Sequence, residues 1–377
     1  MMQPDTGWPP GDFPGLAYMK HAPRLQRDHR PGELNLKSCE LLHPGVLSWQ
    51  AANIARLEPR DFVQYPLSGS ALAGIAEAYR RSPQSVLLTP GTDYAIQLLT
   101  EAIGVPAGRV VIANPHFDGW DRAALRFQVP LDEVTAREGK PVAVQSLVER
   151  MRSGPPGLVV VTQPDSITGH LYPAGEMAAL SAAAAHHGSV VVIDTCYLAF
   201  SDDGEESLAG IDRHPHALRI NSFSKCFGLA GARVGAVLAA ESVIDYLSGW
   251  NSASLVSGPA QRLLIEALRD PAFFTGIYRE IRSARGHLTE AVPQVRSKWQ
   301  ARTSHANFVA FDVPLGEGVS AAGQLREAGI RIKCLTGVAG FRDGVRIATP
   351  SAESVDRVLS ALDRHQRAEL TPSERQS

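Results

Sequence analysis

Three short apolar runs constrain the fold of this 377-residue chain more than any other feature of its sequence. They are residues 110–112, 158–161 and 190–193, and none of them alternates with polar residues. A strand with this pattern is buried on both faces, as in a parallel sheet that helices cover on both sides. Residues 92–103 carry apolar side chains at helical spacing, which predicts one such covering helix. The sequence therefore predicts the α/β class, with a large, doubly wound, mostly parallel sheet.

The pattern changes after Ser257, where long helices alternate with short strands. The expected elements are two helices over residues 259–295 that part near Pro271, helices at 319–328 and 352–365, and strands at 306–311, 330–333 and 345–348. We therefore expect a large domain at residues 46–256 and a small α+β domain formed by both chain ends, residues 1–45 and 257–377. Residues 1–33, with Pro and Gly throughout, are expected to form an irregular lead.

Composition and charge argue against several classes of function. The formal net charge is -2 and no run of Lys and Arg occurs, so the clustered basic charge of a nucleic-acid-binding protein is missing. No stretch approaches about 18 consecutive apolar residues, so we expect no contact with a membrane interior. The scattered histidines and cysteines lack the spacing of a metal site. Cysteines without C-x-x-C pairs fit reduced thiols in a cytoplasmic protein.

The most informative motif is a lysine followed by a glycine-rich segment, Asn221-Ser-Phe-Ser-Lys-Cys-Phe-Gly-Leu-Ala-Gly-Ala-Arg-Val-Gly235. A phosphate loop of the GxxxxGK[ST] type does not fit, because here the glycines follow the lysine. A surface lysine beside a flexible turn would explain Lys225 alone. The whole string resembles the cofactor-lysine signature of class I/II aminotransferases, which are pyridoxal 5'-phosphate (PLP) enzymes of fold type I. The resemblance implies that Lys225 holds PLP as a Schiff base and that Ser222, Ser224 and Arg233 bind its phosphate.

A carboxylate follows the apolar run at residues 190–193. Asp194 is thereby placed at the carboxyl edge of the sheet, where open α/β sheets bind ligands. A carboxylate that caps the next segment would explain the same position. The resemblance implies that Asp194 pairs with the pyridine nitrogen of PLP and that Tyr197 hydrogen-bonds the ring hydroxyl. The family usually carries Asp-Glu-Ala-Tyr here, and Thr195 and Cys196 replace its two middle residues.

The segment Pro90-Gly-Thr-Asp93 opens the helix expected at residues 92–103. The start of a helix offers free N–H groups and a favourable dipole to a phosphate. An ordinary Thr or Asp helix cap would explain the same residues. The segment resembles the phosphate cup of the family, which implies that Gly91, Thr92 and Asp93 contribute to cofactor binding.

Two further segments resemble cofactor-contacting parts of the family with substitutions. The segment at residues 114–120 implies that Phe117 stacks on the cofactor ring, where relatives more often carry Tyr or Trp. In the segment at residues 162–169, Ser166 stands where relatives have an Asn that contacts the ring hydroxyl, and Ile167 replaces the following Pro. A serine can reach the same hydroxyl through a water-bridged bond.

Four residues are implied on the substrate side and at a subunit contact. Arg346 resembles the arginine that clamps the substrate carboxylate, although a surface ion pair would explain an arginine on an edge strand equally well. Asn307 is implied as a substrate neighbour, and Lys333 as a phosphate-binding residue of the substrate site. Tyr65 resembles the tyrosine that reaches the phosphate of the neighbouring subunit, which implies a homodimer with shared sites.

The resemblance runs from about Leu34 to Leu362 and is greatest to histidinol-phosphate aminotransferases and threonine-phosphate decarboxylases. It implies an aminotransferase that moves an amino group between an amino acid, or a phosphorylated amine, and a 2-oxo acid. A decarboxylase, lyase or cyclase that uses the same cofactor is the alternative, because the bond that breaks depends on how the substrate lies over the ring. A cofactor-sensing regulator is disfavoured, because the 33-residue lead has no room for a DNA-binding module.

Overall fold

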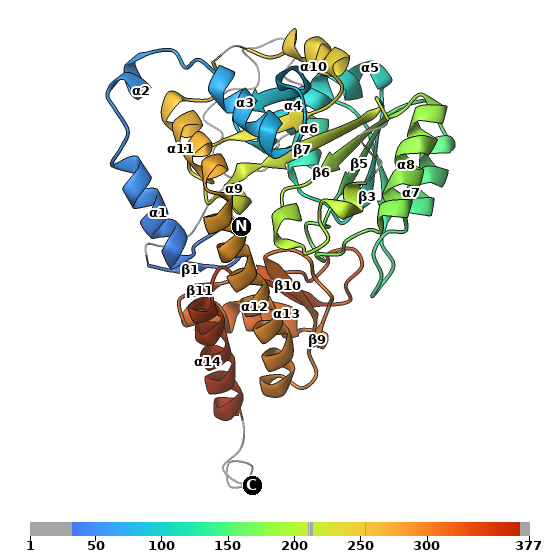
Figure 1. The fold of residues 1–377 in the computed structure, drawn as a ribbon. Helices are drawn as coiled ribbons and strands as arrows, with labels where there is room; N and C mark the ends of the chain where they lie inside the picture. The colour runs from blue at the N-terminus through green and yellow to red at the C-terminus, as the bar shows by residue number, and fades with distance from the viewer. Residues whose placement is uncertain (1–31, 210, 212–213, 253, 370–377) are drawn as a thin grey trace, which may run out of the picture.

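The computed structural model describes residues 32–209, 211, 214–252 and 254–369, and Figure 1 shows their arrangement. The irregular lead expected at residues 1–33 therefore lies almost wholly outside the described residues. Within the described part of the chain, no helix combines the length and the apolar character needed to cross a membrane.

The α-helices are α1 (Pro44–Ile54), α2 (Arg60–Val63), α3 (Gly69–Ala78), α4 (Thr92–Leu99), α5 (Val105–Ala107), α6 (Gly119–Phe127), α7 (Val144–Arg152), α8 (Ala174–His187), α9 (Phe223–Cys226), α10 (Glu241–Ser248), α11 (Gly258–Arg269), α12 (Pro271–Val295), α13 (Glu317–Glu327) and α14 (Ala352–Glu369). The strands are β1 (Leu34–Asn35), β2 (Val86–Thr89), β3 (Val110–Asn114), β4 (Leu131–Thr135), β5 (Leu158–Thr162), β6 (Val190–Asp194), β7 (Ala217–Ser222), β8 (Gly235–Leu238), β9 (Gln300–Ala301), β10 (Phe308–Asp312), β11 (Ile330–Arg331), β12 (Lys333–Cys334) and β13 (Gly344–Ala348).

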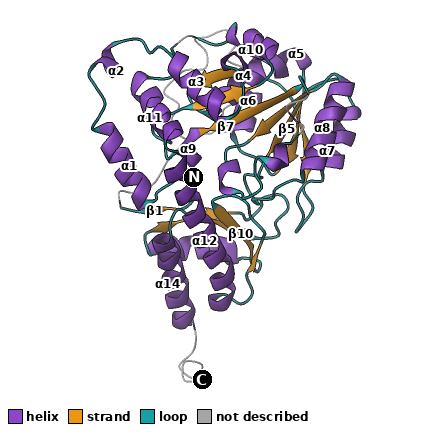
Figure 2. Ribbon diagram, in the orientation of Figure 1, coloured by secondary structure: helices purple, strands orange, loops and turns teal. Residues whose placement is uncertain are grey.

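The central sheet has the order β2-β8-β7-β6-β5-β3-β4 within the described residues. Strands β4, β3, β5, β6 and β7 pair in parallel, while β8 pairs antiparallel with both β7 and β2. The three apolar runs are β3, β5 and β6, so the prediction of buried parallel strands is confirmed. The fold is the expected α/β class, with a mostly parallel sheet between layers of helices (Figure 2).

Alternate side chains of these strands enter two separate cores, which explains why the runs contain no polar residue. On β5, Leu158 and Val160 pack with helices α4, α6 and α10, whereas Val159 and Val161 pack with α7 and α8. A strand covered on both faces cannot place a charged side chain without burying it. The central strands are therefore buried along almost their whole length, and polar side chains appear where the strands end.

A second, antiparallel sheet of order β12-β13-β10-β9 lies below the first, packed against α12 and α14 (Figure 1). Helices α11 and α12 part at Asp270, which confirms the break expected near Pro271. Helix α12 runs from the central sheet toward the smaller sheet (Figure 1). The boundaries of the two domains, 46–256 against 1–45 and 257–377, stay a prediction.

The single strand expected at residues 330–333 is wrong. The chain changes sheets within this segment: β11 pairs in parallel with β1, and β12 pairs antiparallel with β13. Local sequence cannot reveal the change, because both partners come from distant parts of the chain. The helix expected at residues 92–103 is helical throughout, but its regular part ends at Leu99 and a π-helical turn, Thr100–Gly104, follows.

The glycine that begins β8 allows the fold to bring two backbones together. A Cβ on Gly235 would lie 3.0 Å from the carbonyl oxygen of Asn221 and 3.0 Å from the carbonyl carbon of Gly91. Both neighbours are main-chain atoms, so they cannot move aside as a side chain would. This contact holds the turn after β2 against the segment that leads to Lys225.

We predict that Gly235→Ala lowers the free energy of unfolding by about 1–3 kcal/mol, because the added methyl group overpacks a backbone contact. Chemical denaturation measures the change. Gly231→Ala is the matched control, because a Cβ there meets no atom within 4 Å. Equal stability of the two variants would contradict the close packing of β8 on Gly91.

Candidate active site

Most of the side chains singled out from the sequence gather at the carboxyl edge of the central sheet. Asp194 ends β6 and lies in register with Thr162 of β5 and Ile220 of β7. Strand β7 ends at Ser222, and the short helix α9 that follows it carries Lys225. Parallel strands end at a common edge, so these residues come together although the chain separates them.

The side chain of Lys225 is half-buried and its pKa is lowered. Burial is the main cause, and the nearby Arg346 guanidinium acts in the same direction; Cys39, Cys196 and Glu40 oppose it. Its Nζ donates a hydrogen bond of 2.6 Å to the backbone carbonyl of Ser38. A lowered pKa favours the neutral amine, which is the nucleophilic form of a lysine.

Asp194 is a buried carboxylate whose pKa is raised, mainly by its burial. Its Oδ1 accepts a hydrogen bond of 3.0 Å from the backbone N–H of Cys196, which lowers the pKa without offsetting the effect of burial. A cationic N–H placed against this carboxylate would favour its charged form. The environment of Asp194 therefore fits a protonated ring nitrogen.

A cradle for an anion lies beside Lys225. Gly91 has φ +82° and forms the N-cap of α4, where it leaves the first N–H groups without a side-chain cap. A Cβ on Gly91 would lie 2.8 Å from Nη2 of Arg233, so the backbone itself approaches the guanidinium. The carboxylate of Asp93 pairs with Arg233 at 2.9 Å, which leaves its backbone N–H as the group suited to a phosphate. Free N–H groups and an arginine form a donor set that fits a phosphate monoester.

Ser166 and Arg346 meet at this edge from different sheets. One η-nitrogen of Arg346 donates to the backbone carbonyl of Ser166, and the other donates to that of Lys37 at 2.8 Å. The hydroxyl oxygen of Ser166 is buried and has no hydrogen-bond partner among the described residues, and the same holds for Nε of Arg346. A buried polar atom without a hydrogen bond lowers the stability of the fold unless a ligand or water supplies the missing partner.

Three consecutive carbonyls close the site from the amino-terminal side. Those of Lys37, Ser38 and Cys39 accept hydrogen bonds from Arg346, Lys225 and Asn307 respectively. Cys39 adopts φ +56°, a conformation that is uncommon for a residue with a side chain. We call residues 37–39 the carbonyl strap.

The remaining predicted residues differ in how they reach the site. Tyr197 is buried edge-on against Phe308 at 5.3 Å, and burial raises its pKa. Lys333 is half-buried and lies opposite Arg346 across β12 and β13. Asn307 is fully buried, and its Oδ1 has no partner among the described residues. Tyr65 is 89% exposed on the loop after α2, so a single chain does not bring it into the site.

Phe117 sits in a turn that a histidine holds in place. The two ring nitrogens of His116 lie 3.2 Å from the carbonyl of Phe117 and 3.2 Å from the Glu133 carboxylate. His116, Asp121 and Glu133 also place ligand-type atoms within 4.8 Å of one another. Because both ring nitrogens already face hydrogen-bond partners, we interpret this cluster as support for the Phe117 turn and not as a metal site.

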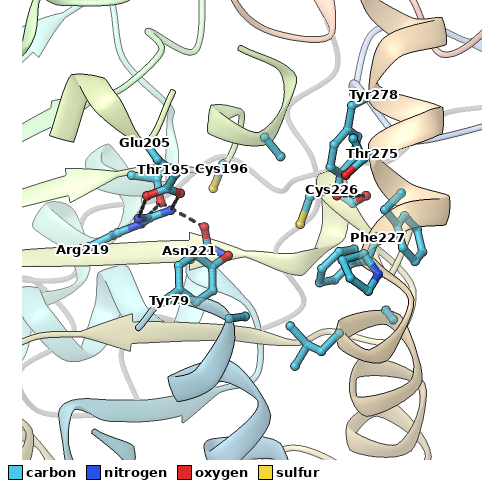
Figure 3. A pocket seen from close by; sticks show the side chains of 16 residues that line it. Tyr79, Thr195, Cys196, Glu205, Arg219, Asn221, Cys226, Phe227, Thr275 and Tyr278 are labelled. Carbon is cyan, nitrogen blue, oxygen red and sulfur yellow. Dashed lines mark hydrogen bonds and ion pairs between the residues drawn. The ribbon is translucent and has the colours of Figure 1, made fainter. Parts of the chain in front are cut away.

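Sequence reasoning missed a polar network behind Asp194. The network lines a cavity of about 200 Å³. Figure 3 shows Arg219 in contact with Glu205 and Thr195 on one side of it. Arg219 donates two hydrogen bonds to Glu205, at 2.9 and 2.8 Å, and one of 2.9 Å to the hydroxyl of Thr195. Its guanidinium also lies over the ring of Tyr79. The one sequence signal was an arginine inside the apolar strand β7.

Comparison with known proteins agrees with this geometry. The model of the family "Aminotransferase class I and II" matches residues 32–362. The chain is 30% identical over 308 residues to the histidinol-phosphate aminotransferase of Xanthomonas campestris pv. campestris, a match that covers 78% of this chain and 82% of that protein.

Two solved structures share the fold. The histidinol-phosphate aminotransferase from Sinorhizobium meliloti in complex with pyridoxal-5'-phosphate has a TM-score of 0.77 at 21% identity, covering 89% of this chain and 92% of that one. The L-threonine-O-3-phosphate decarboxylase from Porphyromonas gingivalis has a TM-score of 0.74 at 17% identity, covering 88% and 99%. At these identities both likenesses support the fold alone.

Proposed function

The chain belongs to the class I and II aminotransferase family, whose cofactor is pyridoxal phosphate, and we propose that Lys225 is the residue that binds this cofactor covalently. The enzyme transfers an amino group between an amino acid or a phosphorylated amine and a 2-oxo acid. The observation that carries the residue assignment is that a half-buried amine of lowered pKa and a buried carboxylate, Asp194, share the edge of the sheet with an anion cradle.

Each group at the sheet edge suits one part of the cofactor. When bound, pyridoxal phosphate supplies an electrophilic aldehyde and a ring that withdraws electrons from the substrate's α-carbon. Lys225 offers its amine to the aldehyde, and its lowered pKa lets Nζ carry a proton to or from that carbon. Asp194 would keep the ring nitrogen protonated, and the hydroxyls of Tyr197 and Ser166 would hold the ring hydroxyl. Phe117 stacks on the ring.

The phosphate of the cofactor is held by the cradle of Gly91, Thr92 and the N–H of Asp93, together with Arg233. Ser222 and Ser224 stand at the start of α9, where the Ser222 hydroxyl accepts from the backbone N–H of Ser224 at 3.2 Å. A dianionic phosphate suits this set because charged and neutral donors converge on it.

The substrate lies between Lys225 and the small sheet. Arg346 binds the substrate carboxylate, which replaces the backbone carbonyls that now accept from it. Asn307 flanks this carboxylate, and its orphaned Oδ1 is available to a donor on the substrate. Lys333, the strand partner of Arg346, binds a phosphate on the substrate.

We also propose a homodimer in which Tyr65 reaches the cofactor phosphate of the second subunit. Tyr65 belongs to a series of strongly exposed apolar side chains on α1, α2 and the following loop. These elements lie side by side at the edge of the molecule (Figure 1). The series comprises Leu47, Ile54, Phe62, Val63, Tyr65 and Leu67, which are 53–92% exposed. An apolar surface of this extent is typical of a protein interface.

For the location of the enzyme we propose the cytoplasm, because the four cysteines, all within the described residues, are unpaired thiols.

We predict that the purified protein with its cofactor is yellow and that borohydride fixes the cofactor onto Lys225. Lys225→Ala abolishes the absorption band of the lysine-bound cofactor and the adduct on the peptide, as mass spectrometry will show. The exposed Lys298, changed to Ala, serves as the control and keeps both. A wild-type protein that stays colourless with added cofactor, or an adduct on another lysine, would contradict the assignment.

Arg346→Ala should lower kcat/KM for carboxylate-bearing substrates. Loss of one member of a desolvated charged pair costs ~2–5 kcal/mol, which is roughly a thirty- to several-thousand-fold loss. A surface ion pair would cost about 0–1 kcal/mol. Arg342→Ala is the control, because Arg342 is an exposed arginine in the turn before β13. A loss of kcat/KM below about threefold for every substrate would show that Arg346 has a structural role and does not bind the substrate carboxylate.

The dimer is tested by mixing subunits. Tyr65→Phe should weaken cofactor binding about tenfold or more, because a hydrogen bond to a charged group is lost. A hybrid dimer of one Tyr65→Phe subunit and one Lys225→Ala subunit has one site with both Lys225 and Tyr65 and one site with neither. Tight cofactor binding should therefore return to half of the sites of the hybrid. Sedimentation of a monomer, or hybrids that bind no better than Tyr65→Phe alone, would contradict shared sites.

A further inference from the structure

The polar network behind Asp194 connects the two chain segments that carry the proposed cofactor residues. Its centre is Arg219, which is 9% exposed and lies on β7 between two apolar neighbours, Leu218 and Ile220. Burial of a charge is costly, and an ion pair with an exposed partner such as Glu205 contributes little stability. The stability of the fold therefore does not explain an arginine at this position.

The contacts of Arg219 belong to a closed circuit of four side chains, which Figure 3 shows. Nε of Arg219 donates to the hydroxyl of Thr195 at 2.9 Å, and that hydroxyl lies 3.0 Å from Oδ1 of Asn221. Nδ2 of Asn221 donates to the hydroxyl of Tyr79 at 2.8 Å. The guanidinium of Arg219 lies over the ring of Tyr79, 4.6 Å from its centroid. Each of the four side chains is therefore held by two of the others.

The hydroxyl of Thr195 has a single hydrogen, and Arg219 determines where it points. Because Oγ1 accepts from Arg219, the hydroxyl directs its own hydrogen toward β7. The carbonyl of Ile220 lies there at 2.9 Å, and Oδ1 of Asn221 lies at 3.0 Å. The backbone N–H of Thr195 donates to the same carbonyl at 2.9 Å. Thr195 therefore continues the contact between β6 and β7 beyond Asp194, the last residue of β6.

The two ends of this contact lead directly to the proposed cofactor residues. Thr195 follows Asp194 in the chain. Asn221 precedes Ser222, which is the N-cap of the short helix that carries Lys225. A shift of the contact between Thr195 and Asn221 would therefore change the distance between Asp194 and Lys225.

Packing does not hold these side chains on their other side. Arg219, Thr195 and Asn221 all line the cavity of about 200 Å³. A cavity supplies no van der Waals contacts to the side chains that line it, so their positions depend on their hydrogen bonds. Arg219 is held in turn by its two hydrogen bonds to Glu205.

We propose that Arg219, acting through Thr195, is a positioning residue that fixes Asp194 relative to Lys225. The proposal rests on the proposed function, because Asp194 and Lys225 are the residues that we assign to the ring nitrogen and the aldehyde of the cofactor. It adds two residues, Arg219 and Thr195, that touch neither the cofactor nor the substrate in that assignment.

Thr195→Val removes the hydroxyl and keeps the shape of the side chain. Asp194 should then hold the proton of the ring nitrogen less well, and this positive charge lowers the pKa of the Lys225 nitrogen when the cofactor is bound to it. The pH at which the absorption band of the lysine-bound cofactor changes should therefore rise on the order of one unit, or about 1.4 kcal/mol. Absorption spectra recorded across the pH range measure this transition without turnover.

Two matched variants control for the loss of a hydroxyl. Thr195→Ser keeps the hydroxyl and should return the transition to the wild-type pH. Thr275→Val removes a hydroxyl that lines the same cavity outside the network, and it should leave the transition unchanged. A purely structural role of Thr195 would lower the denaturation midpoint of Thr195→Val and leave the pH of the transition where it is.

Kinetics give a second measure of the same effect. In Thr195→Val, kcat should fall about ten- to a hundredfold, because misplaced groups slow the chemical step. KM should change little, because Arg346 and Asn307, the residues that we assign to the substrate, are untouched.

Arg219→Lys tests whether the arginine acts through Thr195. Lysine keeps the positive charge but lacks the planar fork that contacts Glu205 and Thr195 together, so the transition should shift in the same direction. Effects that pass through one contact are not additive. Arg219→Lys combined with Thr195→Val should therefore shift the transition no further than Thr195→Val alone. Glu205→Gln changes an exposed side chain and should produce a smaller shift of the same sign in a protein whose core is intact.

A wild-type transition in Thr195→Val, or equal shifts in Thr195→Val and Thr275→Val, would overturn the proposal. Additive shifts in the double variant would show that Arg219 does not act through Thr195, which also overturns it. If the holoenzyme is yellow, these results refute the positioning role alone. A protein without the Lys225 adduct would instead refute the residue assignment on which the proposal rests.

Discussion

The carbonyl strap is the constraint on which the arrangement of the site depends. Its carbonyls, from Lys37, Ser38 and Cys39, accept from a guanidinium, an amine and an amide that come from both sheets. Buried donors of these kinds need partners, so the strap and the two sheets fix one another. The left-handed conformation of Cys39 costs free energy. It persists because the surrounding contacts hold the backbone in this conformation.

The same contacts bear on the role that we propose for Arg346, the binding of the substrate carboxylate. Backbone carbonyls are neutral acceptors, and a substrate carboxylate gives Arg346 charge-assisted hydrogen bonds that are roughly twice as strong. Exchange of one for the other therefore releases the strap from Arg346 without leaving the guanidinium unpaired. The position of the bound carboxylate also sets which bond of the α-carbon faces the ring, so the geometry of Arg346 bears on transamination against decarboxylation.

Sequence predicted the parts of the fold and site that short segments determine. Strands β3, β5 and β6 were predictable because burial on both faces excludes polar residues, and Asp194 was placed because it ends such a strand. Residues 330–333 were not predictable in detail, because their two partners, β1 and β13, lie far away in sequence. The carbonyl strap was not predicted for the same reason, because it follows β1, which pairs with the distant strand β11.

The network behind Asp194 gives a physical reason for one departure from the family pattern. Relatives carry a glutamate directly after the aspartate, whereas here Thr195 follows it, and Arg219 takes its carboxylate from Glu205 on a loop. Burial alone would raise the pKa of Glu205, but the hydrogen bonds and charge of Arg219 lower it. A second carboxylate beside Asp194 would disfavour its charged form. The pairing of Arg219 with Glu205 keeps this acid on the loop, away from Asp194, the carboxylate that we propose for the ring nitrogen of the cofactor.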